Sequence, residues 1–239
     1  MINLLRKVRM SLIPNKGMGK YLVYALGEIV LVVLGILIAL SINNWNEERK
    51  ETQRLRSILQ ILADDLENDL ENVEEILEYY EGYRDEFIAL MEGTMTLEQF
   101  QACKQCAYLV TGHRAFTIER RGYEALKEFY SGYQEDALVN ETVQFYTASI
   151  DELATIDNLI RESIVKDLVK WRDQYDWFPE FARQVESPGY NQYAVSSVEF
   201  RNMTAWRYAL IYTNYVGAAQ TFRDGLLKVK EDISQRLGT

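Results

Sequence analysis

Hydrophobic residues dominate the chain from Tyr21 to Ile42, where Glu28 is the single charged residue. At about 1.5 Å per residue, a helix of this length covers the ~30 Å hydrocarbon layer of a bilayer. Trp45 follows at the position where an aromatic belt meets the membrane surface. A cleaved signal peptide is the competing interpretation, but its apolar core is usually only about 7–15 residues long. The pattern therefore predicts a transmembrane helix over 21-44.

Beyond the span, apolar residues recur every three or four positions, which is the spacing of an amphipathic helix. They are Leu55, Ile58, Leu62, Leu66, Leu70, Val73, Leu77, Tyr80, Phe87 and Met91. No proline interrupts this run, and Gly82 is its only glycine. The span and the following segment are therefore expected to form one helix to about Glu92.

Capping signals mark the next helices. Thr96 and Gln99 have the spacing of a capping box and predict a short helix. Another helix is expected through ERRGYEALKEFY (119–130), ending at Ser131-Gly132. Asn140 is the expected N-cap of a long helix that ends near Phe178, before a proline.

The C-terminal part contains one expected loop and one expected helix. FARQVESPGYNQYAV (181–195) is interpreted as an extended loop, and Ser196 with Glu199 as a second capping box. The box would open a final helix to about Leu237. Because no segment shows a convincing period of two, the predicted fold is all-α: an N-terminal single transmembrane helix continuing into an elongated helical bundle, with 45-239 as its helical domain.

Charge predicts the orientation. Residues 1-20 carry five Lys and Arg residues and no acid, although the whole chain has a formal net charge of −10. Leu4, Leu5 and Val8 have helical spacing there, which predicts an amphipathic segment on the anionic cytoplasmic surface or, alternatively, a docking helix for a cytoplasmic partner. The positive-inside rule places the N-terminus in the cytoplasm and 45-239 in the periplasm, with the span in a bacterial inner membrane. The acidity of that domain argues against a nucleic-acid partner.

Glu28 raises the sharpest question about function, because a charge two turns inside a span is costly. Steps of three and four residues place it on one stripe with helix–helix seam spacing: Ala25, Glu28, Val32, Gly35, Ala39 and Ile42. Gly35 and Ala39 form a small-xxx-small pair that permits close backbone approach. The stripe predicts association with copies of the same span or with a partner's helix. Glu28 would then bond across the seam, titrate in an ion-driven machine, or snorkel to the interface.

Three stretches carry a resemblance to a known family. They are GEIVLVVLGILIALSINNWNEERK (27–50), GYEALKEFYSGYQEDALVNETVQFYTASI (122–150) and VEFRNM (198–203). The first of them looks like the hallmark anchor of an uncharacterised family of single-pass inner-membrane proteins from Bacteroidota, a family of unknown function. The resemblance implies an anchored helical domain and no established activity.

The motif CKQC contains the two cysteines of the chain, Cys103 and Cys106. A thioredoxin-like site needs a strand before the motif, and a metal site needs two more ligands. Here the pair is expected within a helix, where two reduced cysteines are favoured and a local disulfide is the alternative in an oxidising periplasm. His113 is the only histidine, so triads and Glu-x-x-His metal sites have no second member.

The remaining clusters have ordinary structural interpretations. Nine carboxylates between Asp64 and Glu81 are typical of a solvated helix face, with a basic partner or weak calcium binding as alternatives. Aromatic residues at helical spacing are expected to fill a narrow bundle or an interface, with a groove for a sugar or a small aromatic molecule as the alternative. They are Trp171, Tyr175, Phe178, Trp206, Tyr208, Tyr212 and Tyr215.

These patterns predict a protein that is not an enzyme and needs no cofactor. The first hypothesis is a membrane-anchored scaffold or interaction protein in contact with the lipid bilayer, either a homo-oligomer or a subunit of a membrane protein complex. The second is an accessory subunit of an energy-coupling or transport complex, with Glu28 in a proton path. A periplasmic ligand sensor is the third.

Overall fold

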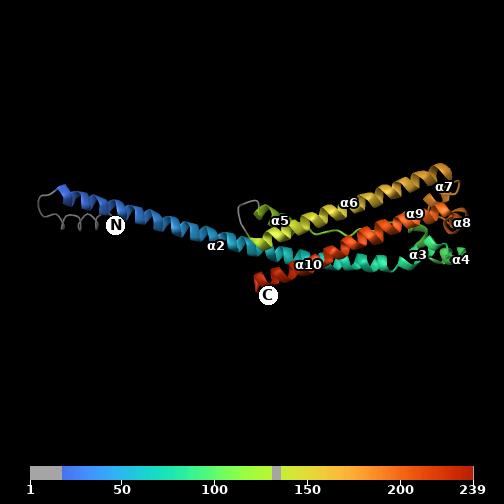
Figure 1. The fold of residues 1–239 in the computed structure, drawn as a ribbon, viewed down its shortest axis with the longest axis horizontal. Helices are drawn as coiled ribbons and strands as arrows, with labels where there is room; N and C mark the ends of the chain where they lie inside the picture. The colour runs from blue at the N-terminus through green and yellow to red at the C-terminus, as the bar shows by residue number, and fades with distance from the viewer. Residues whose placement is uncertain (1–17, 131–135, 239) are drawn as a thin grey trace. The chain divides into compact units, whose positions relative to one another are not determined.

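The computed structural model describes residues 18–130 and 136–238, and all regular elements in these residues are helices (Figure 1). The chain divides into two compact units, Met1–Arg54 and Leu55–Thr239. The basic segment predicted over 1-20 falls almost wholly outside the described residues, as does the predicted helix end at Ser131-Gly132. The all-α fold class is confirmed.

The described residues of the first unit form the N-terminal part of helix α2 (Met18–Glu81). This helix is long and apolar enough to cross a membrane by length and composition, and none of its most apolar stretch is buried within the protein. The predicted N-terminal apolar helix is therefore confirmed. After residue 54 the same helix continues into the second unit, where its apolar positions pack against the rest of the bundle.

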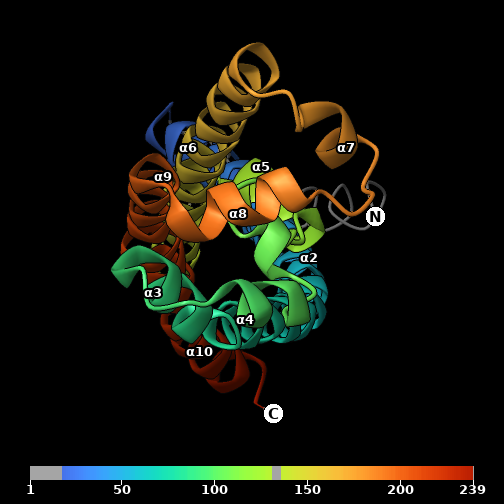
Figure 2. The same ribbon diagram turned by 90° about the vertical axis from the view of Figure 1, so that its right-hand side faces the viewer.

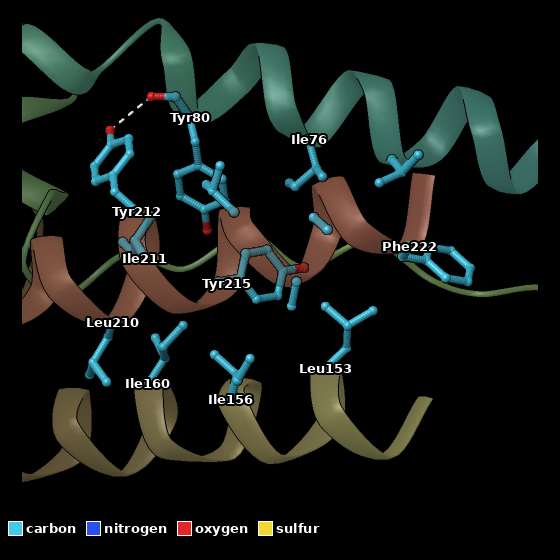
Figure 3. Close-up of a cluster of buried hydrophobic side chains, with 14 of the residues drawn as sticks. Ile76, Tyr80, Leu153, Ile156, Ile160, Leu210, Ile211, Tyr212, Tyr215 and Phe222 are labelled. Atoms are coloured by element: carbon cyan, nitrogen blue, oxygen red, sulfur yellow. Dashed lines mark hydrogen bonds between the residues drawn. The ribbon is translucent and has the colours of Figure 1, made fainter. Parts of the chain in front are cut away.

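The expectation of one helix to Glu92 is wrong, because a turn at Gly82 and Tyr83 separates α2 from α3 (Arg84–Glu92). The carbonyl of Tyr80 accepts the Tyr83 N–H at 3.2 Å and the hydroxyl of Tyr212 at 2.8 Å (Figure 3). These bonds satisfy a carbonyl that a broken helix would leave open. Gly93 then ends α3 with a left-handed φ of 69°.

Helix α4 (Leu97–Ala102) begins with the predicted capping box, which is confirmed in both directions between Thr96 and Gln99. A short 3-10 turn, η1 (Cys106–Tyr108), follows. Residues 113–120 have no regular structure and lead into α5 (Arg121–Tyr130). The helix predicted over ERRGYEALKEFY is thus present.

The sequence predicted Asn140 as the N-cap of the long helix α6 (Ala137–Gln174), but the helix begins earlier. Its N-cap is Asp136, whose carboxylate accepts the backbone N–H groups of Leu138 and Val139. An acid at this position also complements the positive end of the helix dipole. The helix ends at Gln174, four residues before the expected Phe178, which instead opens α7 (Phe178–Ala182).

The extended loop predicted over 181–195 is also wrong in its second half. Helix α8 (Pro188–Ser196) lies there, with Ser187 as its N-cap and Pro188 in its first turn. Proline suits that position because its missing N–H would be unpaired in any case. The next helix, α9 (Val198–Tyr208), is capped by Ser197 and not by Ser196.

The final helical run is continuous to Leu237 but not uniform. Between α9 and α10 (Val216–Leu237) lies a π-helical stretch, η2 (Ala209–Tyr215). Its wider turn buries four large side chains, Leu210, Ile211, Tyr212 and Tyr215. The sequence pattern did not predict this irregularity.

Three long elements build the core of the second unit, namely the C-terminal part of α2, helix α6, and the run from α9 to α10 (Figures 1 and 2). Figure 3 shows side chains from all three meeting: Ile76 and Tyr80 from α2, Leu153, Ile156 and Ile160 from α6, and Tyr215 between them. Helix α5 adds a further layer against α6. The bundle buries most of its apolar positions, in contrast to the span.

Candidate functional site

The predicted packing stripe of the first unit lies on one side of a regular helix. We call Ala25, Glu28, Val32, Gly35, Ala39 and Ile42 the Glu28 face. Val32 and Ile42 are 56% and 60% exposed, and Glu28 is exposed as well. A Cβ atom added to Gly35 would meet no atom within 4 Å. No described residue therefore covers the face, and the space at Gly35 is open for another helix.

Glu28 makes no hydrogen bond or ion pair with any residue that the structure describes. At the other end of the span, Asn43 donates to Glu47 at 3.0 Å and the Arg49 guanidinium lies 5.9 Å from the ring of Trp45. These polar groups are satisfied locally, as expected near a membrane surface. Glu28 differs from them because all other residues from Ala25 to Leu40 are apolar.

In the second unit, Cys103 and Cys106 form a disulfide with their Cα atoms 5.4 Å apart. The sequence predicted that the pair lies inside a helix, which is wrong. The two cysteines lie between the end of α4 and the start of η1. Leaving the helix brings the two side chains into the short range that a disulfide needs. Cys106 is fully buried, so the crosslink attaches this turn to the core.

The sequence indicates only a lone histidine at position 113, but in the structure His113 has two hydrogen-bond partners. Its Nε2 lies 2.6 Å from Asp157 Oδ1, and its Nδ1 lies 2.9 Å from the Tyr80 hydroxyl. Asp157 in turn accepts from Arg161 at 2.6 Å. A neutral ring has one N–H group, which lies at Nε2 here because the Asp157 carboxylate can only accept. No spacing in the sequence could have revealed this chain of contacts, because Tyr80 and Asp157 are far from His113 along the chain.

Burial shapes the acid–base behaviour of this chain. It lowers the pKa of His113, against the opposing effect of the hydrogen bond to Asp157. Burial also acts to raise the pKa of Asp157, but hydrogen bonds from Arg161 and His113 outweigh it and hold that pKa below its usual value. The imidazole side chain is only 2% exposed. The arrangement thus orients a buried histidine inside the bundle.

Two fully buried acids on α2, Asp65 and Asp69, hold the start of α5. Asp65 accepts the Gly122 N–H at 2.7 Å and pairs with Arg121 at 2.6 Å. Asp69 accepts the Glu119 N–H at 2.7 Å and the Tyr146 hydroxyl at 3.1 Å. Burial raises the pKa of Asp69 to about 7 despite those two hydrogen bonds.

The predicted solvated acidic face is present beside this pair, because Glu67, Glu71, Glu74 and Glu78 are exposed on α2. Lys230 pairs with Glu67 at 3.2 Å. Within the described residues, no group of three or more His, Cys, Asp or Glu side chains could hold a metal ion. These four carboxylates have the surface position that the sequence predicted, whereas the burial of Asp65 and Asp69 departs from it.

The aromatic residues divide into core and surface. Trp171 is fully buried and stacks on Phe200, with ring centroids 6.1 Å apart. Tyr212 and Tyr215 lie in the core beneath Tyr80 (Figure 3). Trp206 is the exception, at 58% exposed. Filling of the bundle therefore explains most of the cluster.

Comparisons with known proteins add a family and no activity. A search of curated proteins and a search of solved structures each found no match. A match to a known family covers residues 28–117, which begin at Glu28 itself and include the rest of the span, the buried acids of α2, the disulfide and His113. The matched family is one of unknown function (DUF6090), which confirms the resemblance to an uncharacterised family that the anchor predicted.

Proposed function

We propose that this protein is a membrane-anchored, non-enzymatic interaction protein that assembles through the Glu28 face of its apolar helix. The observation that carries the proposal is the exposed acid on an otherwise apolar span, on the same side as Gly35, whose missing side chain leaves open space. A second copy of the span or a partner's helix would cover this face.

Energetics favour such a partner. Insertion of a carboxylate near the centre of a span costs about 2.5–3.5 kcal/mol, so contact with a neighbouring helix that shields it is favourable. Hydrogen bonds between membrane helices contribute about 0.6–2 kcal/mol each. Close backbone packing at Gly35 and Ala39 adds dispersion contacts that larger residues would prevent.

The proposed orientation places the helical bundle in the periplasm of a bacterial inner membrane. It rests on the five basic residues before the span and on the mixed charges that follow it. A reporter fused after Thr239 and active only in the periplasm should give signal. Activity of a cytoplasm-only reporter at the same position would overturn this orientation.

Assembly is tested with three variants of the full chain, Glu28→Gln, Glu28→Leu and Gly35→Leu. Mass measurement after purification in mild detergent reports the oligomer or the co-purified partners. An amide still bonds across a helix seam, so Glu28→Gln should keep the assembly. Glu28→Leu should weaken it by about 0.5–2 kcal/mol, and Gly35→Leu should weaken it by forcing the backbones apart.

Gly27→Leu is the matched control, since it adds the same side chain to another open glycine one residue before Glu28, about 100° around the helix. It should leave assembly unchanged. If Gln and Leu at position 28 both preserve assembly but abolish the phenotype that the wild-type gene restores, the acid carries protons and the accessory-subunit hypothesis replaces this one. Wild-type behaviour of all variants would show that the Glu28 face has no role in assembly.

A further inference from the structure

A cavity of about 100 Å³ opens on the second unit beside the turn that separates α2 from α3. Its walls come from the end of α2, from the turn and α3 that follow it, from residues 105–114 and from the π-helical stretch. Because a single water molecule needs roughly 10–15 Å³ of cavity volume, the cavity has room for a small organic ring. No residue of the Glu28 face lies near it in sequence, and it is independent of assembly through the span.

Half-buried tyrosine rings form the sides of the cavity. Tyr79 and Tyr83 contact each other edge to face with centroids 5.1 Å apart, and Tyr108 lines the cavity from η1. Rings that remain partly exposed around a hollow offer flat apolar faces to a ligand, while their hydroxyls offer hydrogen bonds.

Charge on the walls is already neutralised by the protein. The Arg114 guanidinium pairs with Glu75 and lies 5.2 Å from the Tyr79 ring centroid. His113 also lines the cavity, and its Nε2 lies 2.6 Å from Asp157 Oδ1. A charged ligand would have to displace one of these pairs, whereas an uncharged ligand would not.

Polar groups without a protein partner surround the same space. Among the described residues, none hydrogen-bonds the side-chain amide of Gln105 or the hydroxyls of Tyr83 and Tyr108. The Tyr80 hydroxyl, in contrast, already bonds the backbone of Arg114 at 2.7 Å and 3.0 Å. The available groups are therefore donors and acceptors at the cavity edge, with aromatic faces between them.

The disulfide fixes one of these groups. Gln105 lies within the short loop that Cys103 and Cys106 close. The next turn is held separately, because the Tyr190 hydroxyl donates to the carbonyl of Ala107 at 2.7 Å. Without the crosslink, Cys103 would lose its covalent link to the buried Cys106, so the loop that carries Gln105 would be less restrained while Tyr108 kept its neighbouring anchor.

We propose that this cavity binds a small uncharged sugar ring and that the disulfide positions Gln105 for this contact. The apolar face of the sugar lies on the tyrosine rings, and its hydroxyls bond Gln105 and the hydroxyls of Tyr83 and Tyr108. A pyranose combines a C–H face with a rim of hydroxyl groups, which matches aromatic walls with neutral polar groups at their edge. The size and neutral charge of the cavity exclude nucleotides and phosphorylated sugars from this proposal.

The test uses the full chain in phosphatidylcholine nanodiscs, because detergents with sugar headgroups would compete. Calorimetric titration with D-glucose, D-galactose and N-acetylglucosamine should give saturable binding for at least one of them. Phenol serves as the aromatic probe that lacks the hydroxyl rim. Saturable binding of phenol without binding of any sugar would overturn the sugar assignment.

Variants of the cavity locate the site. Tyr108→Ala should abolish binding, and Tyr108→Phe keeps the ring in case the alanine variant fails to fold. Gln105→Ala should weaken binding roughly fivefold, the loss expected for one hydrogen bond. Gln101→Ala, an exposed glutamine outside the cavity, is the matched control and should bind like the wild type. Equal affinity of the wild type, Tyr108→Ala and Gln105→Ala would place the sugar elsewhere and refute the proposal.

The double variant Cys103→Ser with Cys106→Ser tests the role of the crosslink. It should keep a cooperative thermal unfolding transition, because so short a loop restricts the unfolded chain little. Its affinity for the sugar should fall by about the same fivefold as in Gln105→Ala. Unchanged affinity in a folded double variant would refute the positioning role of the disulfide.

Discussion

Helix α2 carries acids among apolar residues in two regions, and the chain treats them differently. In the second unit, Asp65 and Asp69 are fully buried and receive backbone N–H groups from the segment that leads into α5. In the first unit, Glu28 is exposed and has no partner among the described residues. The described chain thus supplies hydrogen-bond donors to Asp65 and Asp69 but none to Glu28.

The difference shows where each acid acts. A buried carboxylate is tolerated when hydrogen bonds replace its lost hydration, and the bundle provides these from its own backbone. An acid within an apolar span faces the same cost without such groups. No described residue bonds Glu28, and in the proposed assembly a neighbouring helix supplies the missing partner.

Removing both buried acids should have the largest effect on the second unit. In Asp65→Ala with Asp69→Ala, the Gly122 and Glu119 N–H groups and the Tyr146 hydroxyl lose their acceptors. We expect the free energy of unfolding to fall by about 4 kcal/mol, at about 1–3 kcal/mol for each buried group left unpaired. Urea unfolding at pH 6, followed by tryptophan fluorescence in nanodiscs, measures it.

The exposed neighbour Asp64 supplies the control. Asp64→Ala should change the free energy of unfolding by no more than about 0.5 kcal/mol, as surface substitutions usually do. A similar loss in the control and in the double variant would mean that the buried acids have no special role in holding α5.

The second prediction concerns pH. Burial raises the pKa of Asp69 from its ordinary 3.8 to about 7, so the folded chain keeps a proton that the unfolded chain has released. Its contribution to stability is full below pH 3.8 and is lost as pH rises through 7. Between pH 5 and pH 8 we expect a loss of about 2–3 kcal/mol, which Asp69→Asn should remove.

His113 acts in the opposite direction, because burial lowers its pKa. Its contribution is lost as pH falls below the ordinary value of about 6.5. Comparing wild type with Asp69→Asn at each pH cancels this background. Parallel curves for the two proteins would contradict the raised pKa of Asp69.

A smaller effect is expected at Gly122, where α5 approaches α2. A Cβ added there would lie 2.5 Å from the Cα of Leu62, so the contact that brings the Gly122 N–H to Asp65 has no room for a side chain. Gly122→Ala should cost about 2 kcal/mol through overpacking. Gly217→Ala is the matched control, since nothing lies within 4 Å of its added Cβ and alanine favours the helix. Destabilisation of both variants alike would point to a general effect of alanine and not to the close approach.

Local chemistry explains how far the sequence could predict this fold. The span and the capping box at Thr96 were recognisable because neighbouring residues alone determine them. The cap of α6 was not, because Asp136 and Asn140 are both good caps four residues apart. In the structure Asn140 lies within α6, and none of the described residues hydrogen-bonds its buried Oδ1.

Tertiary contacts explain what could not be predicted. The contacts of His113 with Tyr80 and Asp157, and the docking of residues 119–122 on the α2 acids, join residues far apart in sequence. The π-helical stretch has no established sequence pattern, since its side chains look like those of any buried helix. The alignment of the Glu28 face along one side of its helix, in contrast, follows from spacing alone, while its role in packing stays a prediction.

The smallest expected effect completes the comparison between the two regions. Glu28→Leu should leave the free energy of unfolding of the second unit unchanged within about 0.5 kcal/mol, because no described residue of the bundle bonds this acid. The measurement uses a Trp45→Phe background, so that the fluorescence comes from Trp171, Trp177 and Trp206 of the bundle. The same variant should weaken assembly in detergent. If it instead lowers the stability of a bundle that remains monomeric, Glu28 serves folding within the chain, and the contrast with Asp65 and Asp69 fails.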